Sequence, residues 1–347
     1  PQEVEELFKI MRILVEQGKS IIFITHKLRE VMECADRITI IRGGRVVGST
    51  TPKEADASQL AAMMVGRKVE LKVKKTQAKP GNTILSVQGL RVLNNQEQFV
   101  VDGVSFDVKE GEVLGIAGVQ GNGQTELVRA ITGLLPPTEG EIEILGKNTS
   151  KETPRFITEL GSAHIPEDRQ KDGLILSFPV SENLVLNSYY HEPFSKGIRL
   201  QFEEIAKYGQ QLVEKFDIRT PSIQTPVSNL SGGNQQKVIV AREFSRPIKL
   251  LIASQPTRGL DVGSIEYIHK RLMEKRDEGC AILLVSTELD EIIQLSDRIA
   301  VMYRGKILDI LNAKEASKEI LGLLMAGIKP SEEMKRKMPK EEQFITT

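Results

Sequence analysis

The stretch that decides the fold is Leu230-Ser231-Gly232-Gly233-Asn234-Gln235-Gln236-Lys237, which stands directly before an apolar run at 238–244. Serine is a good N-cap residue, and glycine lets a backbone approach a ligand closely. The free N–H groups and the dipole at a helix start favour a bound anion. The stretch therefore predicts a helix whose N-terminus contacts a phosphate. The alternative is an ordinary capped helix.

A second glycine-rich loop follows a predicted buried strand at 113–117 and precedes a predicted helix at 126–131. It reads Gly118-Val119-Gln120-Gly121-Asn122-Gly123-Gln124-Thr125. A phosphate-binding loop has glycine at its first and sixth positions, then lysine, then serine or threonine. Gln124 replaces the lysine, so neutral hydrogen bonds stand where a point charge would contact the phosphates. We expect weak nucleotide binding, with Thr125 still able to face Mg²⁺.

Length and composition set limits on the kind of protein. The chain has 347 residues, enough for two domains, and 47 basic residues balance 47 acidic ones. Nothing global therefore attracts nucleic acid. Cys34 and Cys280 have no disulfide spacing, which fits a reducing compartment and predicts small core residues. No apolar run approaches the roughly 20 residues that cross a bilayer, so a membrane would be reached through a partner.

Part of the sequence occurs twice. Residues 18–47 align with residues 279–308 at a constant offset of 261, which pairs Gly44 with Gly305. Pro1 falls opposite Val262, so we expect the first copy to lack the front of the second. Such a fragment would expose strand edges and have little stability of its own.

Periodicity predicts the elements of the first copy. Apolar residues recur at helical spacing up to Gly18, and a short β-branched run at 21–25 predicts a buried strand. A short helix containing Leu28 and a strand at 38–41 follow, and the strand ends in a Gly43-Gly44 turn.

Together these motifs resemble the ATP-binding cassette (ABC) proteins. The resemblance implies that residues 230–235 bind the γ-phosphate of an ATP held by an opposite cassette. A buried strand at 250–253 leads to Ser254 and Gln255, where ABC proteins carry two carboxylates, and on to the D-loop. An amide cannot accept the proton of an attacking water, so the base role is empty. The D-loop residues are Gly259, Leu260 and Asp261.

Two further positions depart from the family pattern. Thr287 stands where ABC proteins have the switch histidine, and His26 occupies the corresponding position of the first copy. Glu167, within Ile165-Pro166-Glu167-Asp168-Arg169, replaces the glutamine of the loop that senses the membrane partner. The complete cassette thus lacks lysine, both acids and histidine but keeps its signature. The resemblance assigns the switch role to His26 and leaves the enzyme activity of this chain open.

The resemblance implies an α/β, P-loop NTPase-like cassette with a mixed sheet, flanking helices, an antiparallel β subdomain and a helical subdomain. We expect the last third of a first cassette at 1–66, a solvated basic linker at 67–83, a complete cassette at 84–327 and a charged tail at 328–347. The helical subdomain would span 173–229, with Ser181 as a helix cap. Its apolar stripe would contain Phe202, Ile205, Leu212 and Phe216.

Within the family, the tandem arrangement and the Glu-Asp-Arg turn resemble ATPase subunits of bacterial importers for simple sugars and nucleosides. Ser254-Gln255 resembles the nucleoside branch more than the ribose or galactose branch. The resemblance implies ATP and Mg²⁺ as cofactors, permease subunits and a second cassette as partners, and indirectly a substrate-binding lipoprotein. It places the protein peripherally on the cytoplasmic face of the cell membrane, without nucleic acid. Phe99 is a candidate for stacking on adenine.

Two alternatives remain open from the sequence. A soluble ABC protein that acts on ribosomes or DNA is one, although the linker is short and has no aromatic residues between its charges. A truncated product without a working partner half is the other, since these residues contain no consensus phosphate loop.

Overall fold

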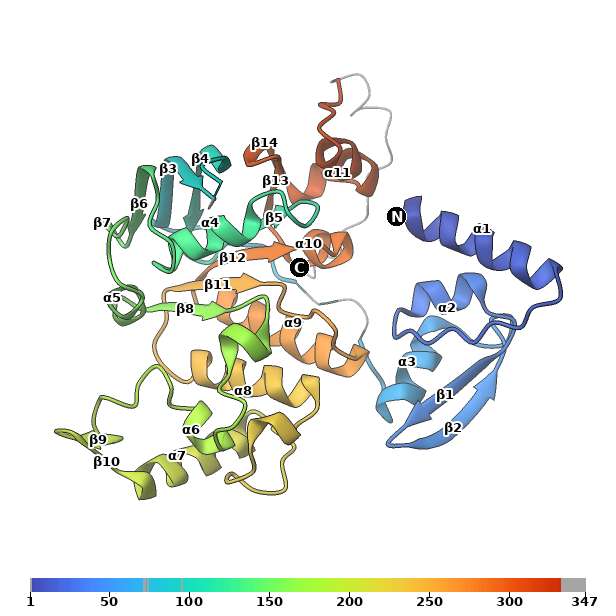
Figure 1. Ribbon diagram of the computed structural model, residues 1–347, viewed down its shortest axis with the longest axis horizontal. Helices are drawn as coiled ribbons and strands as arrows, with labels where there is room; N and C mark the ends of the chain where they lie inside the picture. Colours follow the sequence, from blue (N-terminus) through green and yellow to red (C-terminus); the bar gives the residue numbers. More distant parts are fainter. Residues whose placement is uncertain (1, 71–72, 74, 95, 332–347) are drawn as a thin grey trace. The chain divides into compact units, whose positions relative to one another are not determined.

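The structure is a computed structural model that describes residues 2–70, 73, 75–94 and 96–331. The chain divides into two compact units (Figure 1). The first unit comprises Pro1–Leu71 with Asp261–Glu266, and the second comprises Lys72–Leu260 with Tyr267–Thr347. The predicted tail from residue 332 onward, and Lys72 and Lys74 of the predicted linker, lie outside the described residues.

The first unit contains short helices and a small antiparallel sheet. Its elements are α1 (Gln2–Glu16), α2 (Leu28–Cys34), β1 (Ile38–Arg42), β2 (Arg45–Thr50) and α3 (Ala57–Val65). Ile38 and Ile40 of β1 form a small core with Leu60 of α3. The predicted first helix, second helix and strand with its glycine turn are confirmed. Cys34 is half-buried, whereas Cys280 is buried as predicted.

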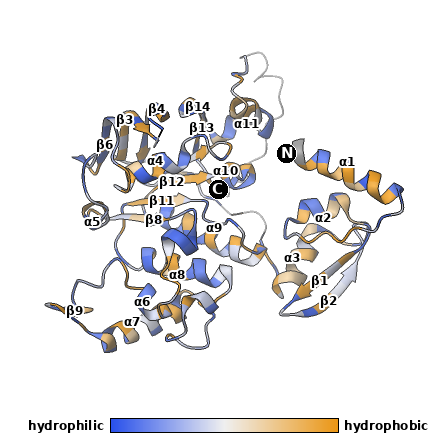
Figure 2. Cartoon of the chain, viewed as in Figure 1, coloured by the Kyte–Doolittle hydropathy of each residue, from blue (hydrophilic) through white to orange (hydrophobic). Residues whose placement is uncertain are grey.

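The predicted buried strand at 21–25 is wrong. These residues form no strand, and the side chains of Ile22 and Ile24 are 91% and 92% exposed. The corresponding strand of the second unit, β12 (Ala281–Ser286), is buried because parallel strands flank it on both sides. The described residues of the first unit provide only the β1–β2 pair, so residues 21–25 have no ladder to join. Figure 2 shows further hydrophobic residues along α1. Ile10 of this helix is also exposed.

The two copies of the repeat share their backbone geometry at the same offset. α2 corresponds residue for residue to α10 (Leu289–Leu295). The β1–β2 ladder has a register shift between Ile40 and Ile41, and the ladder of β13 with β14 has one between Val301 and Met302. The tight turns that follow have positive φ at both central residues in each copy. Within the aligned ranges, the repeat is thus seen in the backbone as well as in the sequence, down to the bulge and the turn.

A six-stranded sheet forms the centre of the second unit, in the order β14-β13-β5-β12-β11-β8. Its strands are β5 (Val113–Ala117), β8 (Ser162–Ile165), β11 (Leu250–Ser254), β12, β13 (Arg298–Tyr303) and β14 (Lys306–Asn312). All neighbours are parallel except β13 and β14, which are antiparallel. β5, β11 and β12 are buried along their whole length, as strands covered on both faces require.

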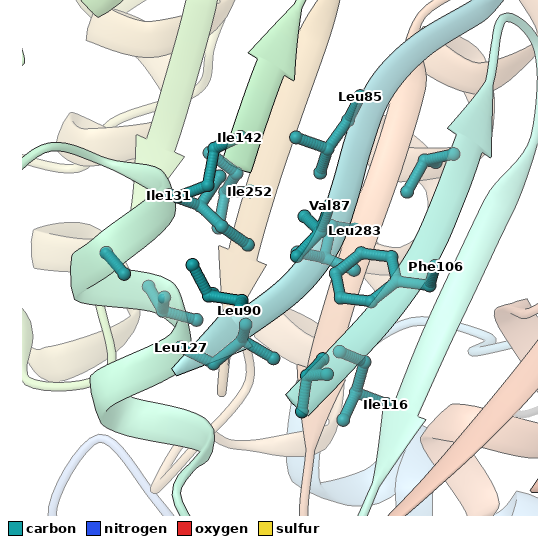
Figure 3. Close-up of a cluster of buried hydrophobic side chains, with 14 of the residues drawn as sticks. Leu85, Val87, Leu90, Phe106, Ile116, Leu127, Ile131, Ile142, Ile252 and Leu283 are labelled. Atoms are coloured by element: carbon teal, nitrogen blue, oxygen red, sulfur yellow. The ribbon is translucent and has the colours of Figure 1, made fainter. Parts of the chain in front are cut away.

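An antiparallel sheet in the order β4-β3-β6-β7 forms the β subdomain. Its strands are β3 (Thr83–Leu93), β4 (Phe99–Lys109), β6 (Glu139–Ile144) and β7 (Lys147–Asn148). Figure 3 shows Leu85, Val87 and Phe106 of this sheet facing side chains of the central sheet and of α4 (Gln124–Ile131). One buried cluster therefore joins both sheets and fixes the helix that follows the phosphate loop.

Helices cover the central sheet on both sides. In Figure 1, α4 lies on one side of β11 and β12, and α8 and α9 lie on the other. The remaining helices are α5 (Pro154–Glu159), α6 (Val180–Asn183), α7 (Phe202–Lys215), α8 (Gly232–Phe244), α9 (Val262–Asp277), α10 and α11 (Lys318–Met325). Shorter turns are η1 (Arg169–Gly173), η2 (Val227–Asn229) and η3 (Ala313–Glu315), and β9 (Ser195–Lys196) pairs with β10 (Arg199–Leu200).

The helical subdomain differs from its prediction in two details. Pro179, not Ser181, is the N-cap of α6, and Ser181 lies buried inside the helix. Ile205, Leu212 and Phe216 are buried as predicted, but Phe202 at the start of α7 is 61% exposed. Phe202 is the first residue of α7, and the surface against which the rest of the apolar stripe packs does not extend to it.

The linker is not wholly solvated as predicted. Lys75 is buried, and its Nζ donates to the carbonyl of Ser296 and lies 2.9 Å from Oδ1 of Asp297. Asp297 also accepts from the backbone N–H of Val113 at 2.9 Å and contacts buried Arg276. Burial lowers the pKa of Lys75 although Asp297 opposes that shift. The end of the linker is thus attached at the base of β5.

Across the parts of the chain that the structure describes, no helix combines the length and the apolar composition of a membrane span.

We expect Asp297→Ala to lower the free energy of unfolding by about 3–5 kcal/mol, because it leaves the buried charge of Lys75 without its carboxylate and removes one of the two carboxylates that pair with buried Arg276. Urea denaturation followed by circular dichroism measures the change. Asp290→Ala is the matched control: Asp290 pairs with Lys318 on the surface, and its loss should cost less than about 1 kcal/mol. Equal losses in the two variants would contradict a structural role for the buried cluster.

Candidate functional site

The glycine-rich loop at 118–123 joins the buried end of β5 to the first turn of α4. Gly123 is the N-cap of α4 with φ of 100°, and a Cβ there would overlap the carbonyl oxygen of Val100. Gly121 also has positive φ, with open space around it. The predicted order of strand, loop and helix is present, and only glycine fits position 123.

The side chain of Gln124 is folded back across this loop. Its Nε2 donates to the carbonyl of Val119 at 3.0 Å, and its Oε1 accepts from the backbone N–H of Asn122 at 3.1 Å. A Cβ on Gly118 would meet the same amide. One of the N–H groups that could cradle a phosphate is therefore already bonded within the loop. A phosphate must displace the Gln124 amide to reach it.

The carboxylate of Glu167 joins the loop to the turn after β11. Its Oε2 accepts from the hydroxyl of Thr125 at 3.1 Å, and its Oε1 lies 2.7 Å from a guanidinium nitrogen of Arg258. Gln120 donates to the same Oε1 at 3.3 Å. Arg169 in turn donates to the carbonyl of Arg258 at 2.9 Å. Residues 120–125, 167–169 and 258 thus form one polar network.

The structure brings together two of the positions predicted to have lost charge. Oε1 of Gln255 lies 3.3 Å from both the backbone N and the hydroxyl of Thr287. Gln255 has φ of 48°, and its N–H donates to Val285 at 2.7 Å. Ser254 is buried at the end of β11. A neutral amide and a neutral hydroxyl therefore face each other at the end of the sheet, and neither can act as a base at neutral pH.

The buried carboxylate of Glu291 holds the turn after β11 in place by a hydrogen bond. Oε1 of Glu291 accepts from the hydroxyl of Thr257 at 2.7 Å and lies 2.9 Å from Nε2 of His269. Burial alone would raise the pKa of Glu291, but the hydrogen bonds from His269 and its neighbours hold it below the usual value. The carboxylate therefore stays ionised in the interior, and its contacts fix the turn.

Ser231 is the N-cap of α8, as predicted, but its side chain makes no capping bond to the helix backbone. Its Oγ instead accepts from Nδ2 of Asn234 at 3.0 Å, and Oδ1 of Asn234 accepts from the N–H of Arg219. The Ser231 side chain is exposed, and Gly232 and Asn234 are partly exposed. Leu230, Gly233 and Gln235 are buried behind them. The hydroxyl proton of Ser231 is therefore free to point outward to a ligand.

The other candidates are distributed between the units. Leu260 is buried in the second unit, and Gly259 before it has φ of 67° with open space around it. In the first unit, the carboxylate of Asp261 accepts from the backbone N–H of Ser264 at 3.0 Å. His26 also belongs to the first unit, and its side chain is exposed. Phe99 is 44% exposed, with the guanidinium of Arg91 over its ring.

Comparison with known proteins identifies this arrangement. Residues 101–258 match the family described as ABC transporter. A solved nucleotide-free ATP-binding cassette from an ABC transporter superposes with a TM-score of 0.58 at 24% identity, and the match covers 70% of this chain and 95% of that one. The predicted cassette fold is confirmed for the second unit. This unit has the fold of an ABC cassette.

Curated relatives match nearly the whole chain. The nucleoside import ATP-binding protein NupA of Lactococcus lactis is 48% identical over 327 residues, and the guanosine import protein NupO of Bacillus subtilis is 49% identical. The ribose import protein RbsA 1 of Rubrobacter xylanophilus is 38% identical. Each match covers 94% of this chain and 64–65% of the relative. The chain thus spans just under two thirds of the length of these proteins.

Sequence reasoning did not find two contacts of the ABC cassette. Nothing in the sequence indicates that Arg258 pairs with Glu167, 91 residues away. The return of Gln124 onto its own loop was also missed. The signal for the first contact is the opposite charge of Glu167 and Arg258 in two turns that each follow a strand of the central sheet.

We expect Gln124→Lys to strengthen the binding of a fluorescent ATP analogue to this chain by about tenfold. The ammonium replaces a neutral hydrogen bond by a charge-assisted one, a difference of about 1.4 kcal/mol. Fluorescence titration measures the dissociation constant. Gln88→Lys, which adds the same charge on an exposed side chain of β3 outside this network, is the matched control and should give a much smaller gain. Equal gains would show that only the general field changed.

Proposed function

We propose that this chain belongs to the ATP-binding, energy-coupling subunit of an ABC importer and that its complete cassette acts mainly in trans. The cassette would supply its signature, residues 230–235, to an ATP held by another cassette, and would hydrolyse ATP poorly or not at all in its own pocket. The observation that carries the proposal is the exposed residue Ser231 in a cassette that has neutral side chains at the four positions 124, 254, 255 and 287.

The chemistry of the pocket supports the loss of hydrolysis. Attack of water on a γ-phosphate needs a group that orients the water and positive charge that stabilises the transition state. Gln255 and Thr287 form a neutral pair where these groups would act, and Gln124 carries no charge. General-base catalysis alone contributes typically 10²–10⁴-fold in rate, so turnover in this pocket should be low.

The geometry of α8 supports the role in trans. The first N–H groups of a helix have no acceptor within the helix, and the helix dipole adds partial positive charge there. α8 spans 13 residues and begins at Gly232, directly after Ser231. Buried Gln236 anchors this helix to the turn after β11 by donating to the carbonyl of Pro256 at 2.8 Å. The signature is thus presented on a rigid element that stays connected to the D-loop.

The repeat supports a tandem arrangement in which residues 1–66 are the end of a first cassette. The shared bulge and turn of β1–β2 and β13–β14 are the structural basis for this assignment. By its position, His26 would be the switch histidine of the first cassette. The relatives are about half as long again as the segment they share with this chain, which leaves room for a complete first cassette.

The relatives also support the choice of substrate and partners. Proteins named for nucleoside or guanosine import share 48–49% identity with the chain, against 38% for one named for ribose import. We therefore assign the importer to nucleosides. Permease subunits in the membrane would be the direct partners, a substrate-binding lipoprotein an indirect one, and the site of action the cytoplasmic face of the membrane. ATP binding would close the paired cassettes, and hydrolysis would reopen them.

The experiment is a pair of variants in the two-cassette protein reconstituted with its permease. Ser231→Ala should lower ATP turnover by about 10–100-fold, because a hydrogen bond to a charged phosphate is worth about 1.5–3 kcal/mol. Gln255→Ala should leave turnover within about twofold, since that residue would have no catalytic task. A phosphate-release assay measures both. Turnover abolished by Gln255→Ala and unaffected by Ser231→Ala would contradict the proposal.

A further inference from the structure

An ion pair between Glu167 and Arg258 lies next to Thr125 at the end of the glycine-rich loop. Thr125 is the loop residue whose hydroxyl faces Mg²⁺ in a phosphate-binding loop. Here that hydroxyl donates to Glu167, and the other oxygen of the same carboxylate contacts the guanidinium of Arg258 at 2.7 Å. A monovalent cation of the chain thus stands next to the position that a divalent cation would occupy.

The donor set at this position does not fit Mg²⁺. Magnesium in nucleotide sites is held by one or two carboxylates together with phosphate oxygens and water. Ser254 and Gln255 are neutral, and Glu167 is already paired with Arg258. The described ranges also contain no cluster of three or more histidine, cysteine or acidic side chains that could bind a metal. A divalent cation here would have to break the ion pair and would be repelled by the guanidinium. The expectation that Thr125 faces Mg²⁺ is therefore not supported.

Arg258 has the properties of a phosphate ligand. Its backbone is fixed on both sides: its carbonyl accepts from Arg169, and its N–H donates to the carbonyl of Gln255 at 3.1 Å. Its side chain is 55% exposed, so the guanidinium can move from Glu167 to a nearby phosphate oxygen without unfolding the turn. A guanidinium binds phosphate through two parallel hydrogen bonds, which neither Gln124 nor Thr125 can offer.

We propose that the pocket of this cassette binds nucleotide independently of divalent metal, and that Arg258 supplies the positive charge that lysine and Mg²⁺ supply in other phosphate loops. Glu167 holds the guanidinium in place until a phosphate arrives. The proposal deepens the proposed function, on which it rests only in taking the ligand to be a nucleotide. It concerns this pocket alone, so an ATP bound at another cassette keeps its own metal requirement.

The test measures the affinity of this chain for a fluorescent ATP analogue in excess MgCl₂ and in excess EDTA at matched ionic strength. The two dissociation constants of the wild-type chain should agree within about twofold. Arg258→Ala should weaken binding by about tenfold in both buffers, the size of one charge-assisted hydrogen bond. Arg199→Ala is the matched control, because Arg199 lies exposed on the β9–β10 hairpin.

A second variant tests whether metal dependence appears when the charges of the pocket are changed. Ser254→Asp combined with Arg258→Ala restores a carboxylate and removes the guanidinium, so its binding should become at least tenfold tighter in MgCl₂ than in EDTA. Tenfold weaker wild-type binding in EDTA, or no measurable binding in either buffer, would overturn the proposal. Neither result would touch the function of the signature, which depends on the Ser231→Ala experiment.

Discussion

The pairing of parallel strands on both sides of β5 is the constraint on which the second unit depends. β12 and β13 hold β5 in register, so the chain leaves the sheet at Gly118 and must turn into α4 within a few residues. Residues 21–25 illustrate the same requirement. Their sequence is as apolar as that of β5, but they pair with no strand among the described residues, and Ile22 and Ile24 stay exposed. Composition selects a strand, but hydrogen-bonding partners are needed to form it.

Local patterns predicted most of the fold. The strand at 113–117 agrees with β5 at both ends, and the signature correctly marked the start of α8. The failures have a common cause in tertiary context. Residues 21–25 needed partner strands, and the burial of Lys75 depends on Asp297, more than 200 residues away. Nothing in the residues adjacent to Lys75 signals that contact.

The candidate site shows the same limit. The sequence predicts which positions of the family pattern carry no charge here, because lysine, two acids and histidine each have a fixed place in that pattern. It names the replacing residues but does not show their contacts. Two contacts depend on the folded chain and became visible only in the structure. One joins Gln124 to Asn122 within the loop, and the other joins Glu167 to Arg258 in the turn after β11. A missing charge can be read from a sequence, whereas the contacts that the replacing residues make are seen only in a structure.

The contact of buried Glu291 with the turn after β11 bears on which substitutions the fold of the second unit can accept. Thr257, His269 and Glu291 share one interior contact that includes none of residues 124, 254, 255 and 287, so it does not depend on a charge at those positions. Damage to this contact would shift the backbone that carries Pro256, and through Gln236 the helix behind the signature. The start of α8 is therefore positioned by interior contacts that include no residue of the glycine-rich loop.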